Sequence, residues 1–199
     1  MAAGTIAAAL ASGSAASAQQ TGEALLVTAH VTDYAHLAPK ELAAAEAEAT
    51  AAYRAAGFHM VWTSDLEAPG AGTEQAASGS IDVRVVILSR DMTEKKCRSN
   101  GLSEDVMGTA VSAATDAHSR IAYIFHDRIE RVAVSQHTPV DRGLGHVLAH
   151  EIGHLLLGIN SHSGDGLMRA DWIPHDRRLQ TFTSGQVRTI RHRFSAAAS

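Results

Sequence analysis

Two histidines four residues apart, with a glutamate directly after the first, stand at His150-Glu151-Ile152-Gly153-His154. Residues four apart lie on one face of an α-helix, so both imidazoles can reach a single ion. Glu151 points about 100° around the helix from His150, which suits a group that takes a proton from a metal-held water. Zn²⁺ accepts imidazole nitrogen readily and lowers the pKa of a bound water toward neutrality. The pattern predicts a Zn²⁺ site with Glu151 as general base.

A third protein ligand is expected after this pair. It is not a glutamate, because no glutamate follows Glu151 in the sequence. Gly158 permits a sharp turn out of the helix, and His162 follows four residues later. This spacing favours His162 as the third zinc ligand. The other candidates along this part of the chain are Asp165, Asp171, His175 and Asp176.

The stretch from His150 to Met168 resembles the metzincin group of zinc peptidases. In that group two helical histidines are followed by a glycine turn, a third histidine and a methionine turn. The segment Gly166-Leu167-Met168-Arg169 corresponds to the methionine turn, which the resemblance places beneath the metal. This sequence has three residues on each side of the turn glycine, where metzincins usually have two.

From about Leu25 to Phe194, the chain is similar to a set of small, uncharacterised bacterial zincin-like proteins. The resemblance implies a zincin-like fold and a zinc-dependent metallopeptidase that hydrolyses peptide bonds, with a peptide or protein as substrate. A sheet-edge strand above the site would then pair with an extended peptide.

Several single residues near the motif have more than one interpretation. His146 lies four residues before the first ligand and is interpreted as a helix-surface histidine, with a place behind the ligands as the alternative. Gly153 costs helix propensity, which indicates close approach of a neighbouring strand. Arg169 and Trp172 are candidates for lining the substrate pocket or stabilising an oxyanion. Cys97 is interpreted as an inert thiol, because its neighbourhood does not match the inhibitory cysteine segments of metzincins.

The elements that must position these residues follow from apolar patterning and helix-end residues. Strands are expected at Leu25–Val31, Phe58–Thr63, Ile81–Leu88, Met107–Val111 and Ile121–Phe125. Helices are expected over 40–56 after Pro39, from Pro139 to Leu157 with Thr138 as cap, and after a capping box at Thr183–Gln186. These elements predict an α+β fold. A small mixed sheet packs against long helices, one of which binds the metal.

The first 20 residues are uncharged and rich in alanine and serine, and Ala16-Ser17-Ala18 stands before a polar pair. This segment favours a secretory signal cleaved after Ala18, with a disordered extension as the alternative. Export would place the protein outside the cell or in a periplasm. Residues 21–199 are expected to form one catalytic domain. No other stretch approaches 18 strongly apolar residues, so no transmembrane helix is expected.

Composition excludes several classes of function. The net charge is −4 and no long basic run is present, which argues against a nucleic-acid partner. A single cysteine, Cys97, excludes both an internal disulfide and a four-cysteine zinc site. A metallopeptidase is therefore the favoured function. The alternatives are a non-catalytic zinc-binding protein and a zinc amidase acting on cell-wall peptides.

Overall fold

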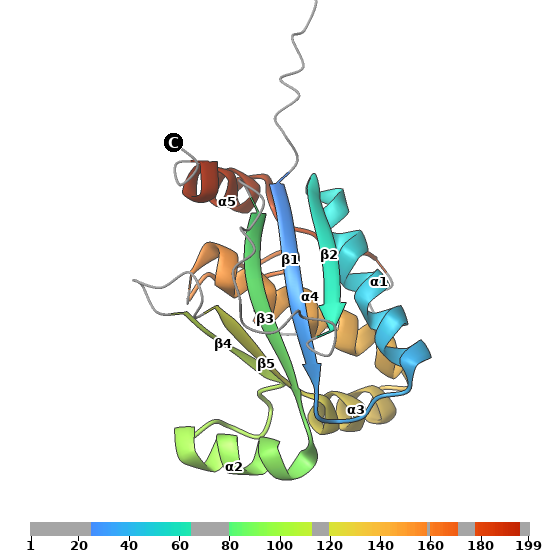
Figure 1. The fold of residues 1–199 in the computed structure, drawn as a ribbon. Coiled ribbons are helices and arrows are strands. Elements are labelled where there is room, and N and C mark those ends of the chain that lie inside the picture. The colour runs from blue at the N-terminus through green and yellow to red at the C-terminus, as the bar shows by residue number, and fades with distance from the viewer. Residues whose placement is uncertain (1–24, 65–79, 113–119, 159, 171–177, 196–199) are drawn as a thin grey trace, which may run out of the picture.

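The computed structural model describes residues 25–64, 80–112, 120–158, 160–170 and 178–195 of the 199-residue chain. The expected export signal in residues 1–20 lies outside these ranges. So do three candidate ligands and one candidate pocket residue: Asp171, His175, Asp176 and Trp172. The described residues form a mixed α+β fold, in which helices pack against a five-stranded sheet (Figure 1).

The sheet is built from β1 (Leu25–Asp33), β2 (Phe58–Ser64), β3 (Ser80–Leu88), β4 (Gly108–Val111) and β5 (Ile121–Phe125). Their spatial order is β2-β1-β3-β5-β4. Neighbouring strands run parallel except at one edge, where β4 pairs with β5 in the antiparallel direction. Among the described strands β4 has one neighbour, so it forms an edge of the sheet.

Buried and partly buried side chains alternate along the strands, so the sheet has an inner face and an outer face. In β1, Val27, Ala29 and Val31 are buried, whereas Thr28 and His30 between them are only partly buried. Successive side chains of a strand point to opposite faces, so the apolar set meets the helices and the polar set faces away. The sheet therefore presents its inner face to the helix that carries the histidine pair.

The helices are α1 (Pro39–Ala55), α2 (Arg90–Asn100), α3 (His126–Ser135), α4 (Val140–Leu157) and α5 (Ser184–Ser195). Figure 1 shows α1, α3 and α4 on one side of the sheet. No helix in the described part of the chain is long and apolar enough to cross a membrane.

Close packing of α1 against α4 fixes the position of the histidine helix. A Cβ atom added at Gly145 of α4 would lie 2.6 Å from Cβ of Glu48 and 2.7 Å from the carbonyl oxygen of Ala45. The two backbones therefore approach more closely than an alanine would allow. Deeper in the same contact, the hydroxyl of Tyr53 donates a hydrogen bond of 3.1 Å to the carbonyl oxygen of Ala149.

All five expected strands are confirmed. Three expected helices are also confirmed: α1, which stops before Gly57, α4, which stops before Gly158, and α5 near the C-terminus. The expected cap at Thr138 is wrong. Pro139 occupies the N-cap position of α4 with no side-chain cap, and the Thr138 hydroxyl lies 3.3 Å from the carbonyl oxygen of Gln136, to which it donates. Two helices, α2 and α3, were not predicted from the sequence.

The capping box before α5 is confirmed. The backbone N–H of Thr183 donates to Oε1 of Gln186 at 2.9 Å, and the backbone N–H of Gln186 donates to Oγ1 of Thr183 at 3.3 Å. Thr183→Ala is expected to lower the free energy of unfolding by about 1 kcal/mol, because one helix-end N–H loses its partner. Denaturant titration measures this loss. Thr189→Ala, in the exposed middle of the same helix, is the matched control, and an equal loss there would contradict the capping role.

Candidate metal centre

Helix α4 places His150 and His154 one turn apart on the same face. The helix is buried along most of its length, and His154 itself is only 8% exposed. Its apolar residues hold it against the sheet and α1, so the two imidazoles start from a rigid backbone. The apolar residues that pack in this way are all buried: Leu144, Val147, Leu148, Ile152, Leu155 and Leu156.

The third histidine reaches the pair because the chain reverses direction after α4. Gly158 ends the helix with φ of 109°, a conformation that glycine adopts readily, and its N–H donates to the carbonyl oxygen of His154 at 2.8 Å. Asn160 follows with φ of 70°. These two positive φ values turn the backbone so that the exposed His162 comes back over the helix.

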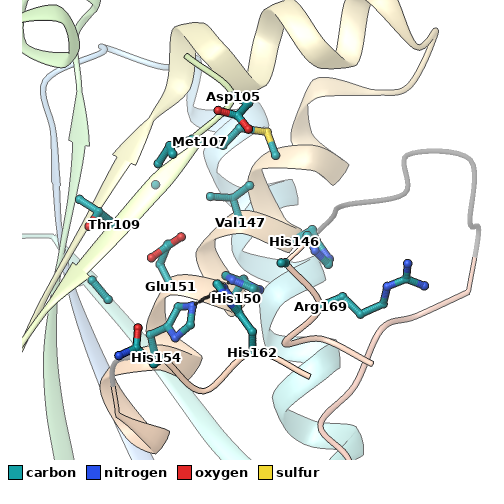
Figure 2. A pocket seen from close by; sticks show the side chains of 15 residues that line it. Asp105, Met107, Thr109, His146, Val147, His150, Glu151, His154, His162 and Arg169 are labelled. Atoms are coloured by element: carbon teal, nitrogen blue, oxygen red, sulfur yellow. Dashed lines mark hydrogen bonds between the residues drawn. The ribbon is translucent and has the colours of Figure 1, made fainter. Parts of the chain in front are cut away.

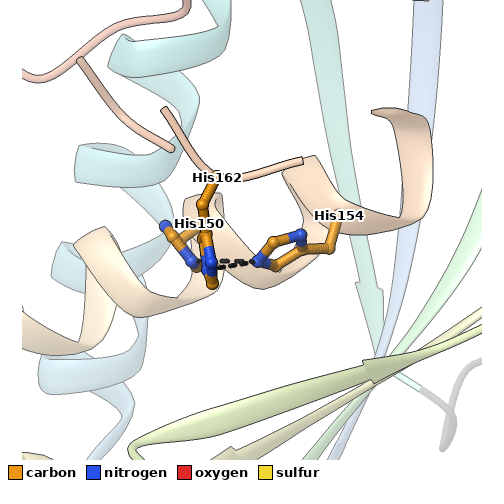
Figure 3. A group of neighbouring side chains, drawn as sticks. All are labelled: His150, His154 and His162. Carbon is orange, nitrogen blue, oxygen red and sulfur yellow. Dashed lines mark hydrogen bonds between the residues drawn. The ribbon is translucent and has the colours of Figure 1, made fainter. Parts of the chain in front are cut away.

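The Nε2 atoms of the three histidines converge on one point (Figure 3). Nε2 of His154 lies 3.1 Å from Nε2 of His150 and 3.1 Å from Nε2 of His162. Zinc–nitrogen bonds of about 2.0–2.1 Å in tetrahedral geometry separate two ligand nitrogens by about 3.3 Å. The three side chains therefore lie close enough to bind one metal ion.

Contacts at the opposite ring nitrogens fix how two of the imidazoles are oriented. Nδ1 of His150 lies 2.9 Å from the carbonyl oxygen of Leu167, which can only accept, so Nδ1 carries the proton and donates. Nδ1 of His154 lies 3.0 Å from Oγ of Ser161. Such partners hold the ring and leave the lone pair of Nε2 for a metal.

Burial keeps the helical pair neutral. Burial, together with the smaller effects of the neighbouring His150 and His162, lowers the pKa of His154 to about 4. Burial is also the main cause that lowers the pKa of His150. A metal ligand must be the unprotonated imidazole, so both rings are in the binding form at neutral pH.

Asp165, the other candidate ligand within the described residues, does not join the cluster. Its side chain is exposed, and among the described residues the group close enough to hold a metal ion consists of His150, His154 and His162. The remaining candidates lie in the range 171–177, which the structure does not describe. Within the described residues, His162 is therefore the third side chain close enough to bind a metal with His150 and His154.

Glu151 lies beside the histidines rather than among them. Figure 2 shows its carboxyl group directed toward the wall formed by β4. The residue is 7% exposed, and burial raises its pKa to about 8. A Cβ atom added at Gly108 of β4 would lie 2.7 Å from Cγ of Glu151, so this strand passes close to the carboxylate. Sequence reasoning did not identify Gly108, because nothing near it in the chain signals a contact with α4.

The three histidines and Glu151 line one cavity of about 290 Å³ (Figure 2). The other walls come from the strand segment Met107–Ala110 and from Asn160 and Arg169. His146, which was expected on the helix surface, is half-buried and also lines this cavity, so that expectation is wrong. Its burial, followed by the charges of His150 and Arg142, lowers its pKa to about 4.

No family model matches this chain, and no curated protein matches it.

Met168 lies directly against the histidine helix. It is fully buried, and a Cβ atom added at Gly153 would lie 2.5 Å from its Sδ and 3.2 Å from Cε1 of Phe182. Gly153 therefore makes room for these two side chains, and the expectation that a neighbouring strand approaches there is wrong. The turn that carries Met168 contains Gly166, whose φ of 75° and closeness to the carbonyl oxygen of Thr181 exclude a side chain.

Cys97 lies away from the metal centre. It is 5% exposed and packs in a separate small cluster with Leu88 and Phe125. A thiol buried among apolar side chains agrees with the interpretation as an unreactive residue.

Gly153→Ala is expected to destabilise the protein although alanine is the better helix former. The helix propensity gained is about 1 kcal/mol, whereas overpacking a buried site costs about 1–3 kcal/mol. We expect a net loss on the order of 1 kcal/mol in the free energy of unfolding, measured by denaturant titration. In a Met168→Ala background the added methyl group has space, so the same substitution should be neutral or stabilising. Equal losses in both backgrounds would contradict the packing of Met168 against Gly153.

Proposed function

We propose that the protein is a zinc-dependent peptide hydrolase in which Glu151 is the general base. The observation that carries this proposal is the convergence of three Nε2 atoms beside a buried carboxyl group in one cavity. The buried Met168 against the histidine helix and the glycine turn after α4 support the resemblance to metzincins. The substrate class follows from that resemblance and from the edge strand beside the cavity.

Zinc fits the donor set of this site. The ligating atoms are three imidazole nitrogens with no thiolate or carboxylate among them, which is a set that Zn²⁺ uses in catalytic sites with one open position. When bound, zinc would supply a water of near-neutral pKa and polarise the substrate carbonyl. His150 and His154 are neutral at pH 7 and already oriented by Leu167 and Ser161, so little rearrangement accompanies binding.

Glu151 has the position and the environment of a proton carrier. It stands one residue after His150, so its carboxyl group approaches the cavity from beside the ligands. Burial favours the protonated form and gives a pKa of about 8, whereas a cation held by the histidines favours the carboxylate. A group balanced between these two forms accepts a proton from the attacking water and then donates it to the leaving amine.

The edge strand β4 offers a backbone surface for an extended peptide. Within the described sheet it pairs with β5 alone, and residues 107–110 line the cavity next to Glu151. An extended peptide that adds to this edge gains main-chain hydrogen bonds while one of its carbonyls lies at the histidines.

A non-catalytic zinc-binding protein is the main alternative. A structural zinc site is usually closed by a fourth protein ligand, but the group found in the described residues has three members and faces a cavity. A buried carboxyl group at the cavity wall also has no use in a structural site. A zinc amidase acting on cell-wall peptides would use the same residues, so substrate tests must include such peptides.

Metal analysis combined with a cleavage assay tests the proposal. Protein purified without added metal is expected to contain about one zinc ion per chain and to cleave members of a peptide library. A chelator should abolish cleavage, and added zinc should restore it. Metal content near zero with no uptake on titration would contradict the zinc site. Bound zinc without cleavage of either peptide set would favour the non-catalytic alternative.

A further inference from the structure

Arg169 lies in the wall of the cavity, and its side chain contacts no polar partner among the described residues. It directly follows the buried Met168, and the pairing of Ser163 with Arg169 holds this part of the loop together. The residue is half-buried and lines the same cavity as the three histidines. Figure 2 shows its guanidinium beyond His146, on the opposite side of the ligands from Glu151.

Other arginines packed against the fold donate to protein carbonyls. Nη1 of Arg128 donates to the carbonyl oxygens of Ser103 and Val106 at 2.6 and 2.7 Å. Nη1 of Arg193 donates to a carbonyl oxygen at the end of α4 at 3.2 Å. Within the described residues, the guanidinium of Arg169 has no hydrogen bond, ion pair or ring contact. A half-buried guanidinium with no partner among the residues that the structure describes has five N–H donors that a ligand can engage.

Among the described residues, the two acidic ones that line the cavity, Glu151 and Asp105, do not neutralise this cation. Glu151 is buried against β4, across the histidines from Arg169. Asp105 is exposed in the loop before β4, and its carboxylate accepts a hydrogen bond from the hydroxyl of Ser103. Among the described lining residues, the side of the cavity at Arg169 therefore carries a positive charge, and a metal ion at the histidines would add to it.

We propose that Arg169 binds a carboxylate group of the substrate and thereby selects acidic peptides. This inference rests on the proposed peptide hydrolase and names a specificity residue for it. A guanidinium matches a carboxylate with two parallel N–H···O hydrogen bonds. The carboxylate comes either from an Asp or Glu side chain near the scissile bond or from the C-terminus of a short peptide.

The experiment measures binding separately from cleavage. Zinc-loaded Glu151→Gln protein is titrated with hexapeptides in which one Glu is moved along a neutral sequence. Each has a Gln-matched partner, and each is made as the free acid and as the C-terminal amide. At least one carboxylate-bearing peptide is expected to bind about tenfold to a hundredfold more tightly than its uncharged partner. Adding Arg169→Gln should remove this preference, whereas Arg169→Lys should retain part of it.

Arg98→Gln is the matched control, because Arg98 is exposed on α2 and its substitution changes the net charge equally. It should leave the preference intact. Binding that depends on the position of Glu indicates recognition of a side-chain carboxylate. Binding that depends on the free C-terminal acid indicates recognition of the terminal carboxylate. Thermal melts of both Arg169 variants identify any loss of fold, and Arg169→Lys serves as the test if Arg169→Gln unfolds.

The outcomes separate this inference from the proposed function. If no carboxylate preference is measured, or if Arg169→Gln leaves the preference unchanged, the inference is overturned even where wild-type protein cleaves peptides. If the preference depends on Arg169 but wild-type protein cleaves nothing, carboxylate binding stands and the hydrolase proposal fails. If Arg169→Gln lowers kcat equally for acidic and neutral peptides, Arg169 acts on the reacting carbonyl and carboxylate selection is overturned.

Discussion

Glu151→Gln is expected to abolish peptide hydrolysis while the metal stays bound. Removal of a general base typically lowers the rate about 10²–10⁴-fold, which corresponds to roughly 3–5 kcal/mol of transition-state stabilisation. Glutamine has the shape of the neutral carboxyl group, and burial already favours that neutral form at Glu151. The variant should therefore fold as wild type does. The measurements are kcat/KM on a cleaved peptide and zinc content per chain.

The same substitution at an exposed glutamate serves as the control. Glu130→Gln on α3 changes the charge equally and lies outside the residues lining the cavity, so its activity should match that of wild type. If Glu151→Gln cleaves peptides at the wild-type rate, the hydrolysis does not use Glu151 as its base. If instead zinc is lost, Glu151 helps to hold the metal, and the separation of binding from proton transfer is wrong.

The histidine pair was predictable because its geometry is local. Any helix brings His150 and His154 to one face, and the apolar residues around them indicated a helix. The turn to His162 was also predictable, because a glycine commonly ends a helix. In the structure Gly158 ends the helix with φ of 109°. The capping box at Thr183 depends on an equally short spacing.

Features that depend on distant parts of the chain were not predictable in this way. The approach of Gly108 to Glu151 and the packing of Met168 against Gly153 arise only when strands and loops return to α4. The burial of His146 has the same origin, because its surroundings come from other elements as well as from its own helix. A single sequence gives the faces of an element but not what covers them.

The two missed helices differ in the signals that they carry. For α2, the residues at both ends are typical helix-end residues. Ser89 caps the start, and Gly101 ends the helix with φ of 62°. The polar composition between them concealed the helix. For α3, no turn residue separates the strand from the helix, because His126 follows Phe125 directly and no side chain caps the start. The sequence therefore offers neither a turn residue nor a capping residue to mark where the helix begins.

His162→Ala is expected to remove most of the affinity for zinc without unfolding the protein. Losing one of three protein ligands should cost more than the 10–100-fold typical of an outer partner, because only the helical pair remains. His162 is exposed and outside the apolar core, so the metal-free variant should unfold at the same denaturant concentration as metal-free wild type. Added zinc stabilises the folded state by a free energy that rises with the logarithm of its affinity for that state. The zinc-dependent rise in melting temperature should therefore be large for wild type and small for His162→Ala.

Asp165→Ala is the matched control for this prediction, because Asp165 is exposed on the same loop, three residues further on. Competition with a chelator measures zinc affinity in both variants. We expect Asp165→Ala to bind zinc as wild type does, since its carboxylate lies outside the three-histidine group. The opposite pattern, with zinc retained by His162→Ala and lost by Asp165→Ala, would move the third ligand to Asp165. Retention by both variants would place the third ligand among the candidates between residues 171 and 177, and the convergence of three Nε2 atoms would then have another cause.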